Sequence, residues 1–311
     1  MAIFNTIIPV FVVIGLGFVL TRRGFFPGEF ATGLNKLVYW VGLPCLLFYN
    51  VAVSEFDYDI AGRTFLGVLG GAAASLVVGY LFVFFSGMKF EGAGTFAQGT
   101  FRGNLMYIGL PVLAYSLGGG QGVLDARTGM IVAFVFALTV PIYNVVSVFA
   151  LLLSRHSFNR GAVKRMFIEL LRNPLIIACV LGVVWGYLFG AMPAAMSRSL
   201  EAIGQMALPL ALLCIGAILA AEHIGGQIFY SVVSSIIKVG VCPLAAYAAG
   251  RWVGLGVDEM RIVMVFSACP TAVASSVLVD QIGGDRRMSA GIVVISTLMS
   301  IISLSVVVSI Y

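Results

Sequence analysis

Charged residues are scarce in this chain. They make up 10% of its 311 residues, and hydrophobic residues make up 60%, whereas soluble domains carry about 25% charged residues. This balance excludes a soluble globular enzyme, a disordered chain and a nucleic-acid binder. The net charge of +5 then records membrane orientation instead of affinity for nucleic acid.

Enzyme and metal signatures are also missing. The two histidines, His156 and His223, have no HExxH spacing, and no phosphate-binding loop of the Walker type is present. The five cysteines lie in apolar stretches without CxxC spacing, as small core residues do. We therefore expect neither an enzyme nor a cofactor nor a metal site, and the missing phosphate-binding loop argues against a process driven by ATP.

Ten hydrophobic segments follow one another along the chain and predict an all-α polytopic membrane protein with ten transmembrane helices. The segments are approximately Ile3 to Leu20, Leu34 to Val53, Thr64 to Ser86, Gly94 to Gly118, Thr128 to Leu153, Asn173 to Phe189, Leu200 to Ala220, Ile228 to Gly250, Ile262 to Val279 and Ser289 to Ile310. The loops are short, and no linker divides the chain. We expect a single membrane domain over residues 1–311, embedded in the lipid bilayer.

The distribution of lysine and arginine predicts the orientation of these helices. Alternating the segments places ten basic residues on the side of the longest polar stretch, Arg155 to Arg172, and four on the other side. The side with the excess faces the cytoplasm. Both termini are therefore expected outside the cytoplasm.

The two halves of the chain resemble each other. Arg102 precedes Pro111 by nine residues in the fourth segment, and Arg261 precedes Pro270 by nine residues in the ninth. Each half holds five segments, so the second half crosses the membrane in the opposite sense, which is typical of inverted-repeat transporters. The expected parts are repeat one over about 1–154, a cytoplasmic loop over about 155–172 and repeat two over about 173–311.

Prolines interrupt the fourth and ninth segments near their middles. Pro111 and Pro270 lack a backbone N–H and clash with the carbonyl four residues earlier, and Gly103 and Gly109 soften the fourth segment further. The helical turn that begins at each proline would direct its positive end toward the middle of the membrane and attract an anion such as a carboxylate. The alternative is two ordinary proline kinks in a packed bundle.

Several polar residues are candidates for contacting such an anion. Asn104, beside the expected break, can donate to a carboxylate, or it can cap the broken helix. Arg102 either reaches the cytoplasmic surface or lines the substrate exit. Asn144, next to Pro141, is a further candidate ligand. Weaker candidates are Gln98, Gln205, Thr271, Ser275 and Ser276.

Lys238 is unusual because it lies near the centre of the eighth segment, between apolar residues. An ammonium group at this depth is costly, so it must face protein or water. It can pair with a substrate carboxylate, pair with Asp280 or serve as a proton-linked charge. A structural lysine that donates to carbonyls freed by Pro243 is the alternative, and Asp280 can equally be an interfacial residue.

These motifs resemble one known family. The stretch from Arg102-Gly103-Asn104 to Gly109-Leu110-Pro111 is similar to the broken fourth helix of the auxin efflux carrier family, including its bacterial members. The resemblance covers essentially the whole chain. Further matching features are Asn173-Pro174, Pro209 with Gly216, Lys238 with Pro243, and Pro270 through Gly283-Gly284-Asp285.

The resemblance implies a fold and a binding site. Its fold is ten helices in two inverted five-helix repeats, similar to bile acid/sodium symporters, with helices four and nine crossing at Pro111 and Pro270. The binding asparagine of the family's fourth helix corresponds to Asn104. With the candidates above, the expected substrate-binding residues are Asn104, Pro111, Asn144, Lys238, Pro270 and Thr271.

The resemblance also implies a function. Substrates of the family are organic anions, namely auxin in plants and dicarboxylates such as malate or malonate in bacteria. The short central loop favours a bacterial permease in the plasma membrane. We expect a secondary transporter of a small organic anion that works by alternating access, with a ligand-binding membrane sensor or scaffold as the alternative. The coupling ion, H⁺ or Na⁺, and a homodimeric assembly are left open.

Overall fold

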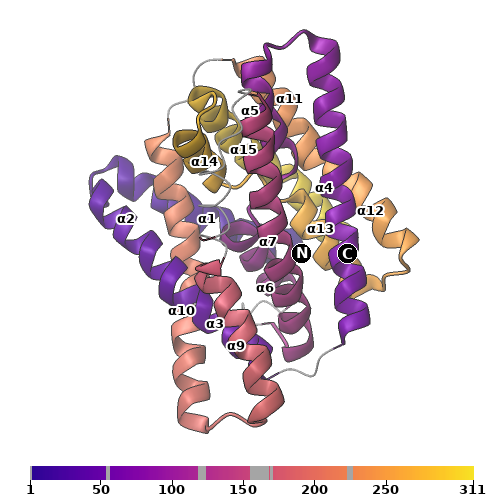
Figure 1. Ribbon diagram of the computed structural model, residues 1–311. Coiled ribbons are helices and arrows are strands. Elements are labelled where there is room, and N and C mark those ends of the chain that lie inside the picture. The colour runs from indigo at the N-terminus through magenta and orange to yellow at the C-terminus, as the bar shows by residue number, and fades with distance from the viewer. Residues whose placement is uncertain (1, 54–56, 118–123, 155–167, 169–170, 223–226) are drawn as a thin grey trace. The chain divides into compact units, whose positions relative to one another are not determined.

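The computed structural model describes residues 2–53, 57–117, 124–154, 168, 171–222 and 227–311. Helices dominate, and no strand occurs within these ranges (Figure 1). Within the described residues, six helical stretches are long and apolar enough to cross a membrane, and three shorter apolar helices accompany them. The prediction of an all-α membrane protein is thus confirmed for the described part of the chain, whereas the ten-span inverted repeat stays a prediction.

The chain divides into two compact units, each built from separate stretches of sequence. Unit 1 comprises Met1–Gly62, Met106–Ala137 and Glu169–Ala221, and unit 2 comprises Arg63–Leu105, Leu138–Ile168 and Glu222–Tyr311. The chain therefore passes between the units several times. Most of the predicted cytoplasmic loop, about 155–172, lies outside the described residues.

Unit 1 is built from apolar helices that pack closely. Its main elements are α1 (Ala2–Arg22), α2 (Gly28–Leu37), η1 (Val38–Gly42), α3 (Leu43–Ala52), α6 (Leu110–Leu117), α9 (Pro174–Leu188) and α10 (Ala194–Ala221). A Cβ atom on Gly17 would overlap the carbonyl of Leu213, and one on Gly216 would overlap the carbonyl of Ile14. The backbones of α1 and α10 are therefore in direct contact, as small residues allow in membrane helices.

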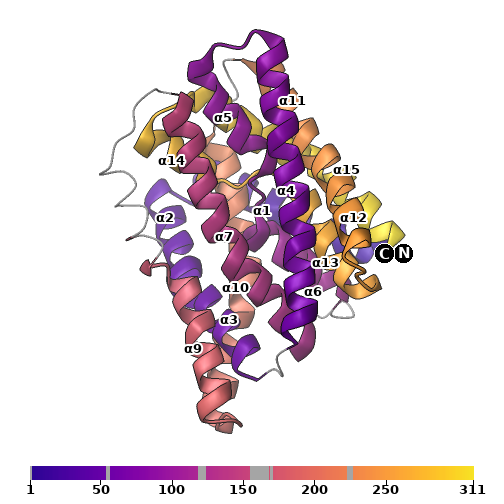
Figure 2. The ribbon, with the colours of Figure 1, turned by 45° about the vertical axis from the view of Figure 1, so that its right-hand side comes forward.

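Unit 2 contains most of the buried polar side chains around the candidate site. Its elements are most of α4 (Tyr58–Ser86), α5 (Phe90–Phe101), the second half of α7 (Ala126–Ser154), α11 (Ile228–Ile236), η3 (Ile237–Val241), α12 (Cys242–Trp252), α13 (Val257–Ala268), α14 (Ala274–Ile282) and α15 (Arg286–Ile310). The rings of Phe82 and Phe96 stack with centroids 5.2 Å apart in its apolar part. In Figures 1 and 2, α4 is one long helix, whereas α13 and α14 are two short ones.

Three five-residue π-helical turns each precede a proline. They are η1, η2 (Leu105–Gly109) and η3, and Pro44, Pro111 and Pro243 follow two residues after them. A proline cannot donate to the carbonyl four residues earlier and clashes with it. The wider turn avoids this clash, because the N–H of Leu43 bonds Val38 and the N–H of Cys242 bonds Ile237, each five residues back.

Pro111 consequently does not break the fourth helical segment. It occupies the second position of α6, where a missing N–H is tolerated. The break lies at Arg102–Asn104 instead, between the end of α5 and the start of η2. The expectation that the helix is interrupted at Pro111 is therefore wrong in position.

Candidate functional site

Two interrupted helices meet within unit 2. Gly103 and Thr271 form an isolated antiparallel β-bridge. The N–H of Asn104 donates to the carbonyl of Pro270 at 2.8 Å, and the N–H of Ala272 donates to the carbonyl of Arg102 at 2.8 Å. We call residues 102–104 and 269–273 the crossing. Each interrupted backbone therefore satisfies polar groups of the other, as required where no water can do so.

The position of the crossing differs from the predicted position on the fourth helical segment. The predicted crossing at Pro111 and Pro270 is replaced by one at Gly103 and Thr271, with Pro270 as a neighbouring acceptor. Pro111 belongs to unit 1 and takes no part in these contacts. Glycine suits position 103 because a Cβ atom there would lie 3.1 Å from the Leu105 side chain and 3.2 Å from the carbonyl oxygen of Phe266, closer than ordinary contact.

The broken end of α13 is completed by side chains from two other helices. The Lys238 Nζ atom donates to the carbonyl of Ser267 at 2.5 Å, and the Ser303 hydroxyl donates to that of Ala268 at 3.0 Å. Thr271 is held twice, because its N–H donates to the Ser296 hydroxyl at 3.0 Å and its own hydroxyl donates to Gly99 at 2.7 Å. These contacts fix the crossing to α5, η3 and α15.

Lys238 is fully buried in η3. Its recorded acceptor is a carbonyl of α13 and not one freed by Pro243 in its own helix, so the structural alternative named the wrong acceptor. The alternative pairing with Asp280 is wrong. An ammonium group has three donors, and Ser267 is the one acceptor recorded for Lys238 in the described chain.

Arg102 is 6% exposed, so it does not reach the surface as one of the two sequence interpretations expected. Its Nη1 atom donates to the carbonyl of Ala274 at 3.2 Å, and its Nη2 atom donates to the Asn144 Oδ1 atom at 2.6 Å. The candidate ligand Asn144 thus has its carbonyl oxygen engaged by Arg102. The substrate-binding residues expected from the sequence did not include Arg102. The position of Arg102 next to Gly103 in the chain was the signal that could have identified it.

Asn104 is the polar residue of the crossing with a disengaged side chain. Its backbone N–H is bonded to Pro270, and the residue is 6% exposed. Its amide group makes no hydrogen bond to any residue in the described ranges, so it does not cap the broken helix. Neither amide atom is among the fully buried atoms that lack a partner, so the group borders accessible space, where it offers a ligand one acceptor and two donors.

Charge at the crossing is uncompensated. Arg102 and Lys238 are both buried, and every acceptor recorded for them in the described chain is a neutral oxygen. A Cβ atom on Gly103, next to Arg102, would lie 3.4 Å from Lys238 Cε, so the two residues frame the same short segment. Buried cations are ordinarily paired. An anion held here would complete the pairing.

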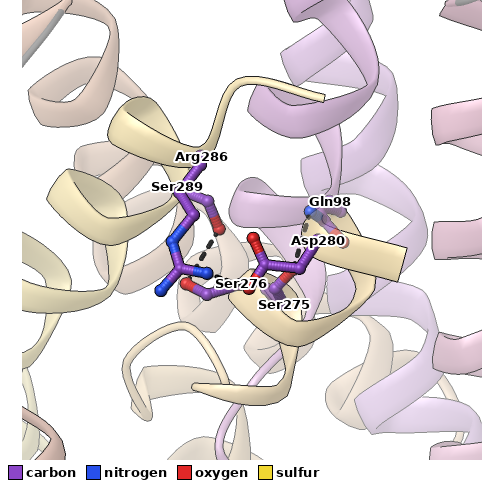
Figure 3. Close-up of polar contacts among 6 residues, drawn as sticks. All are labelled: Gln98, Ser275, Ser276, Asp280, Arg286 and Ser289. Carbon is purple, nitrogen blue, oxygen red and sulfur yellow. Dashed lines mark hydrogen bonds and ion pairs between the residues drawn. The ribbon is translucent and has the colours of Figure 1, made fainter. Parts of the chain in front are cut away.

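Further polar contacts lie among α5, α14 and α15 (Figure 3). The Gln98 amide donates to the carbonyl of Ser275 at 3.3 Å, and the hydroxyls of Ser276 and Ser289 are 3.1 Å apart. Asp280 forms an exposed ion pair with Arg286. Asp280 therefore pairs with Arg286 near the loop between α14 and α15 and is not the partner of Lys238.

The hydrogen bonding near the crossing is incomplete. Gln98 Oε1, Ser267 Oγ and Ser275 Oγ are buried and find no partner within the described part of the chain. Two of these atoms belong to the α5–α14 contact, and the third belongs to the residue whose carbonyl binds Lys238. The surroundings of the crossing are thus polar and partly unsatisfied, as expected for a site that receives a ligand or water.

Comparison with known proteins agrees with a membrane carrier. Residues 2–308 match the family model described as membrane transport protein, which is the auxin efflux carrier family. The chain belongs to this family. Its members are transporters and not enzymes, which confirms the class predicted from the sequence.

Three relatives cover nearly the whole chain. An uncharacterized transporter of Methanocaldococcus jannaschii is 21% identical over 96% of this chain and 95% of its own. A protein of Rhizobium meliloti named "Putative malonate transporter" is 24% identical over 95% of this chain and 91% of its own. The uncharacterized transporter YfdV of Escherichia coli is 23% identical over 94% and 92%.

Proposed function

We propose that this protein is a secondary active transporter of a small organic anion, a carboxylate or dicarboxylate. The observation that carries the proposal is the pair of buried cations at the crossing, Arg102 and Lys238, whose recorded acceptors in the described chain are neutral oxygens. Two buried positive charges favour a ligand with two negative charges. The name of the Rhizobium relative makes malonate the first substrate to test, with malate and auxin-like acids next.

The proposed binding residues differ in the hydrogen bonds that they already make, and this difference suggests a separate role for each. The free amide of Asn104 would donate to a substrate carboxylate, and Lys238 and Arg102 would supply the charge. The remaining members of the proposed binding set are Asn144, Pro270 and Thr271. Asn144 would act by positioning Arg102, because its oxygen already accepts from that guanidinium.

Transport would proceed by alternating access, in which the two units change their relative position. The chain passes between the units at Leu105–Met106, where η2 begins, and at Ala137–Leu138 in α7, close to Pro141. We place these units in a ten-helix inverted repeat, in a bacterial plasma membrane with both termini outside the cytoplasm. A homodimer is part of the same proposal, and the choice between H⁺ and Na⁺ coupling is open.

Counterflow of labelled malonate in proteoliposomes tests the proposal. Vesicles that hold purified protein and unlabelled malonate should accumulate the label, and Lys238→Met vesicles should not. Imposing Na⁺ and pH gradients separately would then identify the coupling ion. Malonate binding without any flux would contradict transport and support the sensor alternative, and absence of binding by every carboxylate tested would contradict both.

A further inference from the structure

The C-terminal end of α1, in unit 1, carries two adjacent arginines. Arg22 and Arg23 are both exposed, and neither guanidinium has a hydrogen bond or an ion pair recorded within the described residues. The Arg22 guanidinium lies over the ring of Phe18, 5.5 Å from its centroid. Because Phe18 lies one turn earlier in α1, this contact holds the charge against the side of the helix.

An exposed apolar face of α1 leads to these arginines. Four residues of this face, each between 43% and 61% exposed, recur every three or four positions: Ile8, Val12, Leu16 and Val19. The N–H of Arg23 donates to the carbonyl of Val19 at 2.9 Å, so Arg23 continues the same face. We call these five residues the α1 stripe. From Val12 to Arg23 a helix rises about 16 Å, about half of the hydrocarbon core of a bilayer.

The turn after α1 places the two arginines near the surface of the membrane. Gly24, at a φ of 76°, ends the helix, and the N–H of Phe25 donates to the carbonyl of Leu20 at 2.9 Å. Phe26 is buried, with its ring centroid 5.7 Å from that of Phe25 and 5.0 Å from that of Phe30. Phe25 and Phe30 are exposed. Exposed aromatic rings at the end of a membrane helix lie at the level of the lipid headgroups.

We propose that the α1 stripe, together with Arg22, binds one anionic phospholipid, whose acyl chain lies along the apolar residues and whose phosphate pairs with the two arginines. Guanidinium groups match phosphate oxygens in geometry and charge. A zwitterionic lipid carries the same phosphate with an added ammonium group, which the arginines repel. The stripe therefore selects lipids by the net charge of the headgroup.

Lipid binding to the purified full chain, followed by native mass spectrometry, tests this inference. Phosphatidylglycerol and phosphatidylcholine with identical acyl chains are the two probes, and they differ in the net charge of the headgroup. Phosphatidylglycerol should bind about tenfold tighter, the order of effect expected from two arginines at a membrane surface. Soluble glycerol 3-phosphate should not displace it, because the acyl chain supplies part of the binding.

Two double variants locate the effect. Arg22→Gln with Arg23→Gln should remove the preference for phosphatidylglycerol. Arg127→Gln with Arg198→Gln removes two exposed arginines from other helices of unit 1, lowers the net charge by the same amount and should retain the preference. Thermal melts of both variants in phosphatidylcholine report whether the fold is intact.

Equal affinities for the two lipids would overturn the inference, and so would an unchanged preference in the Arg22/Arg23 variant. Displacement by glycerol 3-phosphate would overturn it as well, because the site would then bind a free phosphate group and not a lipid. The inference does not depend on the proposed function. Malonate counterflow measured on the same preparation succeeds or fails separately from lipid selection.

Discussion

The two units of this protein bury different kinds of groups. In unit 1, α1 and α10 bring their backbones together at Gly17 and Gly216, and the interface is apolar. In unit 2, the crossing of two interrupted helices surrounds Arg102 and Lys238 with neutral oxygens. Close apolar packing is expected in a unit that keeps its shape. Buried charge without a counter-charge is expected in a unit that binds a charged ligand. The predictions below test this contrast.

Removing a buried cation should have the largest effect. Arg102→Gln is expected to weaken malonate binding roughly 100-fold or more, since truncating one member of a buried charge pair costs about 2–5 kcal/mol. Without malonate its melting temperature should not fall, because an uncompensated buried charge has been removed. Calorimetry and thermal melts measure both quantities. Arg251→Gln, an exposed substitution in α12, is the control, and equal malonate affinity in the two variants would contradict the account.

Enlarging a contact glycine should affect unit 1 without touching the anion site. Gly216→Val is expected to destabilise the protein by about 1–3 kcal/mol or more, because its side chain has no space beside Ile14. Gly15→Val, in α1 with open space around it, is the matched control. Thermal melts compare the two, and similar melting temperatures would show that the α1–α10 contact is not as close as described.

The free amide should matter for binding more than for stability. Asn104→Ala is expected to weaken malonate binding roughly tenfold, the loss of one hydrogen bond to a charged group of about 1.5 kcal/mol. Its melting temperature without ligand should stay near that of the parent. Asn144→Ala should instead lower that melting temperature, because Arg102 loses its side-chain acceptor. If both variants lose only stability, Asn104 is not a ligand.

The exposed ion pair should contribute least. Asp280→Asn removes the partner of Arg286 and is expected to change stability by about 0–1 kcal/mol, as surface pairs do. Malonate binding should be unchanged, because Lys238 donates to Ser267 and not to Asp280. Thermal melts of Asp280→Asn and of the double variant with Lys238→Met test this point. A strong destabilisation of Asp280→Asn that Lys238→Met relieves would contradict the structure and support a pairing of Lys238 with Asp280.

Part of this picture follows from sequence and part requires tertiary structure. The apolar composition predicted the helices, and Pro111 and Pro270 predicted two interrupted spans. The position of the first break was missed because a π-helical turn absorbs Pro111 at the start of α6. The inward direction of Arg102 and the acceptor of Lys238 depend on contacts 42 and 29 residues away, which no local pattern encodes.

The most direct test of the account is a titration of the purified protein with malonate and with malonamide, its neutral isostere. The two buried cations predict that malonate binds and raises the melting temperature, that malonamide does neither, and that Lys238→Met abolishes the difference. Equal binding of malonate and malonamide, or a malonate affinity unchanged in Lys238→Met, would contradict the claim that the crossing is an anion site.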